Sequence, residues 1–458
     1  MPRSHSHPAH RRRVYGFCDD AQNDGAILNC QVNKTDPFKH WLAKVDKERL
    51  EVIENPELAM GQMQALYEKQ GYPKDWIDKR LRGAGKWRGA CEADETQGGY
   101  GQKKTEGRHN MNIDTPLAFP WANAPQPNGE LREIAPGILW LRMPLPLALD
   151  HINLYLLHDD ESDGWMIVDT GIGDAVTRAL WEKIISEKLI GTRIIGIVCT
   201  HYHFDHAGLA GWLTERLRVP LYMSYGEYYT LRTMAMTYEG ELPWQHVEYF
   251  HRCGTPADRL DDILSVIHVS NRLITPPPAA FRRLRPGQSL QIGKRRWQLL
   301  LGEGHVAEHI LLYSPDDQIL IAGDQILPHI TSNVGVLPVE PDADLLSDWF
   351  ASLDRLTPLP ENTLILPSHE LPYTGLHTRI AQLRAHHETQ FATLRRICAT
   401  PITAFDATQQ LFPHRRSKMD DMMALGECLA HLNHLCQRGE IRCQVQTNGV
   451  WLYQTQAA

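Results

Sequence analysis

The chain has 458 residues, and its 42% hydrophobic and 22% charged residues are typical of a globular protein, not a disordered or fibrous one. The formal net charge is −8, so the chain as a whole has no basic field that would attract nucleic acid or anionic lipid. No apolar run approaches the roughly 20 residues that span a bilayer, and none follows the N-terminal arginines, so we expect neither a membrane helix nor a secretory signal.

The nine cysteines form no C-x-x-C pair, which favours reduced thiols over a disulfide framework or a structural zinc ribbon. We therefore expect a cytoplasmic protein. The charge is unevenly distributed: residues 1–110 hold 19 basic and 16 acidic residues, which leaves 28 basic and 39 acidic residues, a net −11, for the rest.

Residues 1–110 predict an N-terminal extension that is mostly disordered. Residues 1–35 are polar and rich in His and Arg, and residues 83–110 are rich in Gly and charge. Between them, apolar residues recur at helical spacing, which predicts short helices at about residues 37–82.

The stretch PFKHWLAKVDKERLEVIENPELAMGQMQALYEKQGYPKDWIDKRLRG, within residues 36–83, resembles a helical segment of phage antirepressor and DNA-damage-inducible proteins of bacteria. The resemblance implies a DNA-associated module. The alternative is a fragment joined by a gene-boundary error, with Met111 as the native start. We favour the fragment, because so short a segment buries too little surface to fold alone.

Short apolar runs rich in β-formers follow in two series, with helical patterns between them. They predict one large α/β domain at residues 130–375, with two packed sheets and helices outside. The first series comprises Ile138–Leu141, Ile152–Leu157, Trp165–Val168, Ile194–Cys199 and Leu221–Met223, and the second Trp297–Leu301, Ile310–Tyr313, Ile319–Ala322 and Thr363–Leu366.

The chain between these series predicts a helical, aromatic cap at about residues 212–280. Eight aromatic residues fall between Tyr222 and Phe250. The cap would either line an apolar substrate pocket or consist of ordinary packed helices.

Residues 376–458 predict a helical, winged-helix-like end. Amphipathic helices are expected at Leu376–Ile397 and at about Lys418–Arg438, followed by a hairpin whose turn is Asn448-Gly449. Such an end would contact nucleic acid, or it would be a packing or dimerising appendage. The appendage is favoured, because the segment has no dense basic run to neutralise phosphates.

The segment VCTHYHFDHAG places four metal-ligating residues in one loop after the strand Ile194–Cys199. Alternate residues of an extended backbone point the same way, so His201 and His203 would face one ion while Asp205 and His206 reach a second. Imidazole and carboxylate ligands suit zinc, and also iron or manganese.

Three further candidates each follow a predicted strand: His305 in EGHVAEH, Asp324 in IAGDQ and His369 in ILPSHE. Loops at one end of a scaffold converge on one site. A lone His or Asp here would be a structural residue, but the whole set predicts a metal site.

The order H-x-H-x-D-H, G-H, G-D and S-H after a V-D-T-G strand end resembles the metallo-β-lactamase superfamily over roughly residues 130–375. The resemblance implies an α/β fold, a four-layer αββα sandwich. It implies one metal on His201, His203 and His305, the other on Asp205, His206 and His369, and Asp324 as the bridging ligand. Asp169 matches an acidic residue beside the site that would orient ligands or water. His309 is expected to pack against the site.

Two neighbouring cations would lower the pKa of a bridging water and make it a hydroxide nucleophile, so hydrolysis is the expected reaction. We expect Asp205 to orient the hydroxide and Asp324 to carry a proton to the leaving group. The pattern is nearest to hydroxyacylglutathione hydrolases and acyl-homoserine lactonases, although DHAGLAG lacks the paired glycines usual in the former.

The sequence thus predicts a binuclear metallohydrolase of a small thioester, lactone or ester, with two divalent ions, zinc before iron or manganese. The partner is a small molecule, with no membrane and no nucleic acid expected, and a homodimer is one option for assembly. The alternative is a nucleic-acid protein, either a ribonuclease or phosphodiesterase or a DNA-associated fusion. The acidic balance beyond residue 110 favours the hydrolase.

Overall fold

The computed structural model describes residues 27–31, 40–46, 49–53 and 117–456, apart from residues 122, 148, 237–241 and 416. The chain divides into two compact units, Met1–Thr105 and Glu106–Ala458, which are described separately. Among the described residues, no helix has the length and apolar character needed to cross a membrane.

The first unit contains an antiparallel sheet, in the order β1 (Ile27–Gln31), β2 (His40–Asp46), β3 (Arg49–Ile53). The predicted helices were therefore wrong for the residues of β2 and β3, and β1 lies in a stretch predicted to be disordered. The run Arg-Leu-Glu-Val in β3 alternates polar and apolar residues, and this strand period prevails over the looser helical spacing. The remaining predicted helical and disordered residues before 111 lie outside the described residues.

The second unit begins with a seven-stranded sheet in the order β10-β9-β8-β7-β6-β5-β4. β4 to β7 are antiparallel neighbours, whereas β7 to β10 are all parallel, so the carboxyl ends of these four strands lie at one edge. The strands are β4 (Arg132–Ala135), β5 (Ile138–Pro144), β6 (His151–Asp159), β7 (Gly164–Val168), β8 (Arg193–Val198), β9 (Leu221–Met223) and β10 (Arg282–Arg283).

A five-stranded sheet follows, in the order β11-β12-β13-β14-β15. All neighbours are antiparallel except the parallel pair β14 and β15. The strands are β11 (Ser289–Ile292), β12 (Arg295–Gly302), β13 (His309–Ser314), β14 (Ile319–Gly323) and β15 (Leu364–Pro367). The strands of both predicted series are confirmed.

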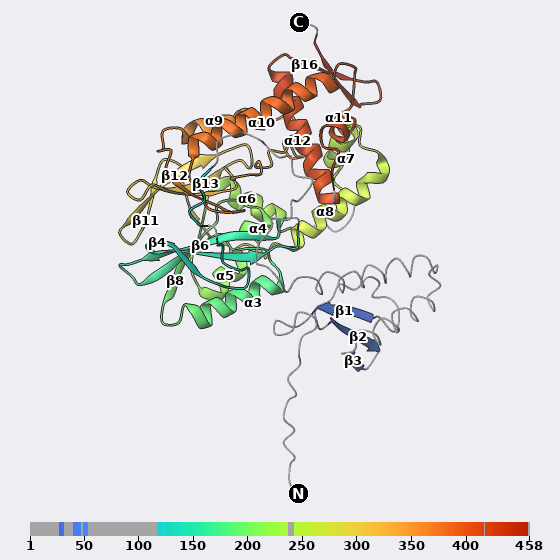
Figure 1. Cartoon of the computed structure of the whole chain (residues 1–458). Helices are drawn as coiled ribbons and strands as arrows, with labels where there is room; N and C mark the ends of the chain where they lie inside the picture. Colours follow the sequence, from blue (N-terminus) through green and yellow to red (C-terminus); the bar gives the residue numbers. More distant parts are fainter. Residues whose placement is uncertain are drawn as a thin grey trace, which may run out of the picture. The chain divides into compact units, whose positions relative to one another are not determined.

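Three hydrophobic clusters show that the sheets pack face to face with helices on both outer faces. Trp140 and Val168 of the first sheet share a cluster with Trp297 and Leu312 of the second, which is the core between the sheets. The alternate residues of each sheet face the helices. The predicted four-layer αββα sandwich is confirmed, and Figure 1 shows both helical layers flanking the sheets.

Three helices cover the first sheet: α3 (Ala175–Lys183), which a π-helical turn at Ile184–Lys188 extends, α5 (Ala210–Leu217) and α6 (Tyr225–Met234). A short helix, α4 (Phe204–Ala207), carries part of the H-x-H-x-D-H motif. The helices in the cluster beyond the second sheet are α7 (Trp244–Arg252), α8 (Leu260–Arg272) after a 3₁₀ turn at Ala257–Arg259, α9 (Leu345–Leu356), α10 (Leu376–Ile397), α11 (Ala404–Leu411) and α12 (Lys418–Gln437).

The segment predicted to form one cap is divided between the two layers. Tyr228 of α6 packs beneath the first sheet, whereas Tyr249 and Phe250 of α7 belong to the cluster beyond the second. These buried aromatic residues favour the packed-helix interpretation. Tyr225 and Tyr229 remain exposed, and Tyr238 lies outside the described residues.

The C-terminal segment has the predicted helices, α10 and α12, and the predicted hairpin, β16 (Ile441–Val445) with β17 (Trp451–Thr455). Gly439 and Gly449 have positive φ angles of 71° and 87°, as the helix end and the tight turn require. The helices share their core with the second sheet, since Leu432 of α12 and Leu320 of β14 lie in one cluster. A winged helix stays a prediction.

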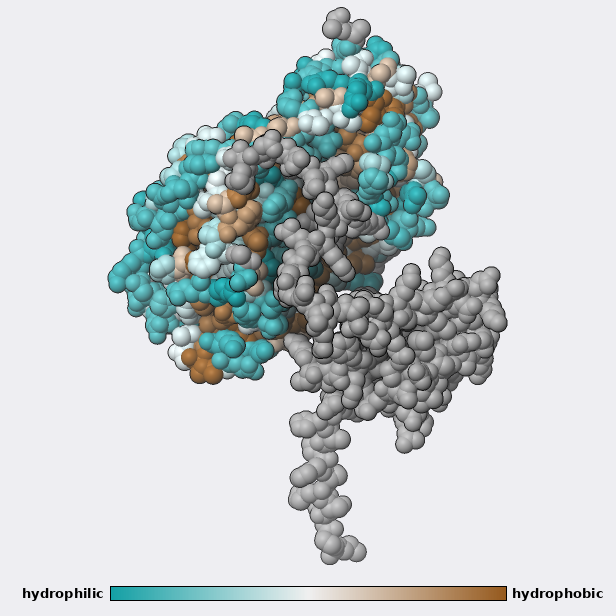
Figure 2. Space-filling model, viewed as in Figure 1, coloured by the Kyte–Doolittle hydropathy of each residue, from teal (hydrophilic) through white to brown (hydrophobic). Residues whose placement is uncertain are grey.

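The visible surface of the second unit is largely hydrophilic on the face in Figure 2, and its hydrophobic residues form small separate patches. Small patches are ordinary for a globular surface and do not by themselves mark an interface.

Candidate metal centre

Loops at one edge of both sheets carry the seven predicted ligands. His201, His203, Asp205 and His206 follow β8. From the second sheet, His305 follows β12, Asp324 follows β14 and His369 follows β15. β14 and β15 are parallel, and β13 begins where β12 ends, so these three loops lie at the same edge.

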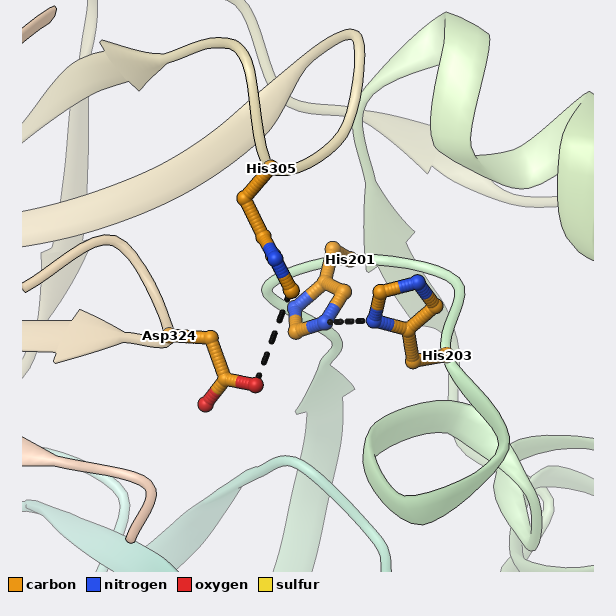
Figure 3. A group of neighbouring side chains, drawn as sticks. All are labelled: His201, His203, His305 and Asp324. Carbon is orange, nitrogen blue, oxygen red and sulfur yellow. Dashed lines mark hydrogen bonds and ion pairs between the residues drawn. The ribbon is translucent and has the colours of Figure 1, made fainter. Parts of the chain in front are cut away.

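The structure gathers the seven residues into two adjoining groups. In each group the candidate ligand atoms lie within 4.8 Å of one another. One group contains His201, His203, His305 and Asp324, and the other contains Asp205, His206 and His369. Figure 3 shows the first group, in which His305 and Asp324 approach from one side and His201 and His203 from the other.

Asp324 lies between the groups. Its Oδ2 is 3.6 Å from His305 Nε2 and 3.4 Å from His206 Nε2, and its Oδ1 is 3.5 Å from His369 Nε2. Asp205 Oδ2 lies 3.4 Å from His369 Nε2. One carboxylate therefore faces both groups, which is the geometry expected of a bridging ligand.

Several atoms that face the centre lack the partners that buried polar groups normally have. His206 Nε2, His305 Nε2 and Asp324 Oδ1 are buried and make no hydrogen bond among the described residues. A buried polar atom without a partner is unfavourable unless something else satisfies it. Their convergence with four further His and Asp ligand atoms fits two divalent cations, and zinc, iron and manganese all accept this donor set.

Contacts behind the histidines aim their ring nitrogens at the centre. His305 Nδ1 donates to the backbone carbonyl of Asn333 over 2.7 Å, and His369 Nδ1 donates to that of His151 over 3.1 Å. His206 Nδ1 lies 2.9 Å from Asp169 Oδ2. Since each Nδ1 is occupied, each Nε2 is left to face the centre.

Asp169 lies directly after β7 in a left-handed conformation, with φ of 61°. Its carboxylate accepts hydrogen bonds from the backbone N–H and the hydroxyl of Thr200, over 2.8 and 2.9 Å. Together with the contact to His206, these bonds attach the end of β7 to the loop after β8. This is the position that the sequence assigned to an orienting carboxylate.

Burial keeps the histidines of the first group neutral. It lowers the pKa of His203 to about 3 and that of His201 well below its ordinary value, and neighbouring histidines add to both shifts. Burial also lowers the pKa of His305, against the attraction of Asp324. Neutral imidazole is the form that binds a metal ion.

The second group is dominated by its carboxylates. Burial alone would lower the pKa of His369, but Asp324 and Asp205 raise it to about 10. Burial likewise opposes a raised pKa for His206, and the charges of Asp324, Asp205 and Asp169 outweigh it. The concentrated negative charge of these carboxylates would equally favour a divalent cation.

Glu227 of α6 is a contributor that the sequence did not reveal. Its buried carboxylate accepts the backbone N–H of Tyr202 over 3.1 Å and that of Glu308 over 2.8 Å. It thereby joins the loop of His201 and His203 to the loop of His305. No local motif marks such a residue, because its partners are backbone groups distant in the sequence.

A second unpredicted cluster holds the loop of His369. The Asn153 side chain donates to the carbonyls of Pro367 and Glu370 over 2.9 and 3.0 Å, and Tyr155 donates to Pro367 over 2.8 Å. His309, expected to pack against the site, is fully buried, stacks on His201 and accepts the backbone N–H of Asp324 over 3.2 Å.

Comparisons with known proteins agree with this geometry. Residues 147–369 match the family model described as the metallo-beta-lactamase superfamily, and residues 391–456 match that of the metallo-beta-lactamase-like C-terminal domain. The crystal structure of a beta-lactamase domain protein from Burkholderia ambifaria is 40% identical, with a TM-score of 0.67 over 74% of this chain and 97% of that one.

Two curated relatives are similar at lower identity. The probable metallo-hydrolase YqjP of Bacillus subtilis is 26% identical, over 65% of this chain and 92% of its own. The human acyl-coenzyme A thioesterase MBLAC2 is 25% identical, over 52% of this chain and 80% of its own.

Proposed function

Because the chain belongs to the metallo-β-lactamase superfamily, we propose that it is a binuclear metal-dependent hydrolase of small thioesters, lactones or esters, with thioesters first. The observation that carries this proposal is the convergence of five histidines and two aspartates on adjoining positions, with Asp324 facing both. A single ion would leave one of the two groups unused.

The distances between the ligand atoms suggest which residues would share an ion. His201, His203 and His305 would hold one ion, Asp205, His206 and His369 the other, and Asp324 would contact both. Zinc is the first expectation, with iron or manganese as alternatives. Two such ions supply Lewis-acid polarisation of the scissile carbonyl and lower the pKa of a water at the site to about 7.

The chain's own groups then position and move protons. In thioester hydrolysis a carbon–oxygen bond forms between the acyl carbon and water, and the carbon–sulfur bond breaks. Asp205, next to His206 and His369, orients the water, while Asp324 takes a proton from it and delivers that proton to the departing thiolate. Asp169 and Glu227 act indirectly, by positioning the loops that carry the ligands.

Thioesters are placed first for two reasons. The ligand pattern is nearest to hydroxyacylglutathione hydrolases, which cleave thioesters, and Asp324 argues against the zinc β-lactamases that carry cysteine at that position. In addition, a relative of this chain is named as an acyl-coenzyme A thioesterase. The superfamily membership alone supports hydrolysis without choosing the substrate.

A substrate panel tests this function. Full-length protein loaded with zinc, iron or manganese is assayed against acyl thioesters, acyl-homoserine lactones, aryl esters and single-stranded RNA. We expect the wild type to hydrolyse the thioesters. His201→Ala and Asp324→Asn should each lower this turnover by at least about 100-fold, because each removes a metal ligand. His414→Ala, at an exposed position remote in sequence from the ligands, is the control. RNA cleavage without ester or thioester turnover would replace this proposal by the nucleic-acid alternative.

A further inference from the structure

Four exposed arginines gather where the first sheet ends at β10. Arg282 and Arg283 form β10, Arg285 follows it, and Arg232 lies on α6. None of the four makes an ion pair with a carboxylate of the described residues. We call these four residues the arginine edge.

Other arginines of the unit pair with carboxylates, although not all of the described ones do. Arg295, Arg355 and Arg384 each have a carboxylate within 2.7 Å, and eight further arginines and two lysines also pair among the described residues. Residues 111–458 contain 39 acidic residues against 28 basic ones. Unpaired cations collected in so acidic a unit form a local positive surface suited to an anion.

Tyrosine rings accompany the arginines. The Arg283 guanidinium lies 5.0 Å from the ring centre of Tyr225, and that of Arg282 lies 5.4 Å from Tyr222. Tyr225 and Tyr229 are 49% and 46% exposed, with ring centres 4.6 Å apart. Guanidinium groups bind phosphate oxygens, and open aromatic faces stack on a nucleobase.

The strand register places the arginine edge beside the metal centre. Val198 of β8 pairs with Tyr222 of β9, and Tyr222 pairs with Arg282, so Arg283 is level with Cys199, two residues before His201. Two strand spacings separate β8 from β10, about 10 Å. In parallel sheets, ligands lie beyond the carboxyl ends of the strands, which is where the arginine edge and the metal centre meet.

The carboxylates between the two places are engaged with the backbone. Glu308 Oε2 accepts the N–H of Gly226 over 2.7 Å, and Glu227 accepts those of Tyr202 and Glu308. Neither contacts an arginine of the edge in the described part of the chain. Arg282 Nη1 donates to the Tyr222 hydroxyl over 2.9 Å, and its other N–H donors, like the exposed guanidinium groups of the other three arginines, are available to a ligand.

We propose that the arginine edge, with Tyr225 and Tyr229, binds the phosphate and base of a nucleotide-bearing thiol, so that the substrate is an acyl thioester of coenzyme A type. This inference rests on the proposed function, since the thioester bond must lie at the metal centre. The arginines then bind the leaving half of the substrate and contribute to its binding rather than to the chemical step.

The test compares two thioesters with the same acyl group. One is the coenzyme A thioester, and the other is the N-acetylcysteamine thioester, which has neither phosphate nor base. In the metal-loaded full chain, Arg282→Gln/Arg283→Gln/Arg285→Gln should raise KM for the coenzyme A thioester about tenfold or more, with kcat little changed. Turnover of the N-acetylcysteamine thioester should be unchanged, which also shows that the variant is folded. Arg193→Gln is the control, because Arg193 is exposed at the opposite end of the same sheet, on β8.

A binding measurement separates this inference from the proposed function. Calorimetry with 3′-phosphoadenosine 5′-diphosphate needs no turnover and should show binding to the wild type that the triple variant loses. Equal kinetic effects on both thioesters, or no binding of the nucleotide, would overturn the inference while leaving the hydrolase intact. Binding of oligouridylate RNA but not of the nucleotide would assign the arginine edge to nucleic acid instead. Nucleotide binding without thioester turnover would contradict the proposed function and the thioester substrate, and would leave only the nucleotide site at the arginine edge.

Discussion

Glu227 shows how one side chain holds two parts of the centre together. Its carboxylate is 1% exposed and bonds to the backbone on both sides of the site, at Tyr202 and at Glu308. The two oxygens of the carboxylate accept from two N–H donors, one in each loop. A side-chain amide has only one acceptor oxygen, so it could bond only one of the two loops in this way. Burial raises the pKa of this carboxyl to about 7, which shows that the environment opposes its charge and that the two N–H groups compensate only in part.

Glu227→Gln should weaken metal binding and turnover without unfolding the chain. The glutamine NH₂ would face one of the two N–H donors, so one loop would lose its bond. We expect metal affinity to fall about 10- to 100-fold, as for other groups behind metal ligands. Competition with a chelator measures it. Glu215→Gln, with a side chain 72% exposed, is the control, and wild-type affinity in Glu227→Gln would disprove the bridging role.

The sequence predicted the seven candidate ligands because their chemistry is local. His201, His203, Asp205 and His206 share one short motif, and the other three each follow an apolar strand. Glu227 and Asn153 were not predicted, because each bonds the backbone of a residue far along the chain, and Asn333 was not predicted, because it binds the ring of His305 through its own backbone carbonyl. Such a contact leaves no spacing pattern in the sequence.

At the scale of elements, α10 and α12 meet through a buried pair of histidines. His387 Nδ1 donates to His431 Nε2 over 2.9 Å, and His431 Nδ1 donates to the carbonyl of Glu427 over 2.7 Å. If His431 Nε2 were protonated, its N–H would point at the N–H of His387 and the hydrogen bond between the two rings would be lost. Burial is the main reason that the pKa of His431 falls to about 4.

This pair makes stability depend on pH. The folded chain binds fewer protons at His431 than the unfolded chain, whose histidine titrates near 6.5, so stability is lost as the pH falls from about 6.5 towards 4. The side chain of His431→Gln does not titrate. Relative to that variant, the free energy of unfolding of the wild type should fall by up to about 3 kcal/mol across this pH window. Urea titrations at several pH values measure the difference. A difference independent of pH would contradict the account, and His414→Gln is the exposed control.

The same helix tests the packing of the C-terminal segment. Leu432 of α12 is fully buried in the cluster that includes the second sheet, whereas Met423 of α12 is 40% exposed. Leu432→Ala should destabilise the protein by about 2–5 kcal/mol through the cavity it leaves, and Met423→Ala by much less. Equal shifts in the midpoint of thermal unfolding would mean that α12 is not part of this core.

The elements of the second unit were largely predictable, and those of the first were not. Long runs such as Ile152–Leu157 and the amphipathic Leu376–Ile397 carry a clear period. The two-residue strand β10 carries none, and it forms only because β9 offers an edge. In β2 and β3, alternation over a few residues competes with helical spacing over many, and the pairing with a neighbouring strand decides.

For the whole molecule, the site lies entirely within the second unit. All seven candidate ligands and the residues that orient them lie between His151 and Glu370, and the chain divides after Thr105. Deleting residues 1–110 should therefore leave the fold, metal content and turnover unchanged. Thermal unfolding and thioester assays of the truncated chain check this. Loss of metal-binding protein in the truncation would show that the first unit contributes to the site.

Metal content measured together with turnover tests the central claim most directly. Full-length protein is analysed for bound metal while acyl-thioester hydrolysis is followed through chelation and re-addition of zinc, iron or manganese. The account predicts two ions per chain and loss of turnover when they are removed. Turnover should recover only when both metal positions are refilled. Full thioester turnover by metal-free protein would contradict it.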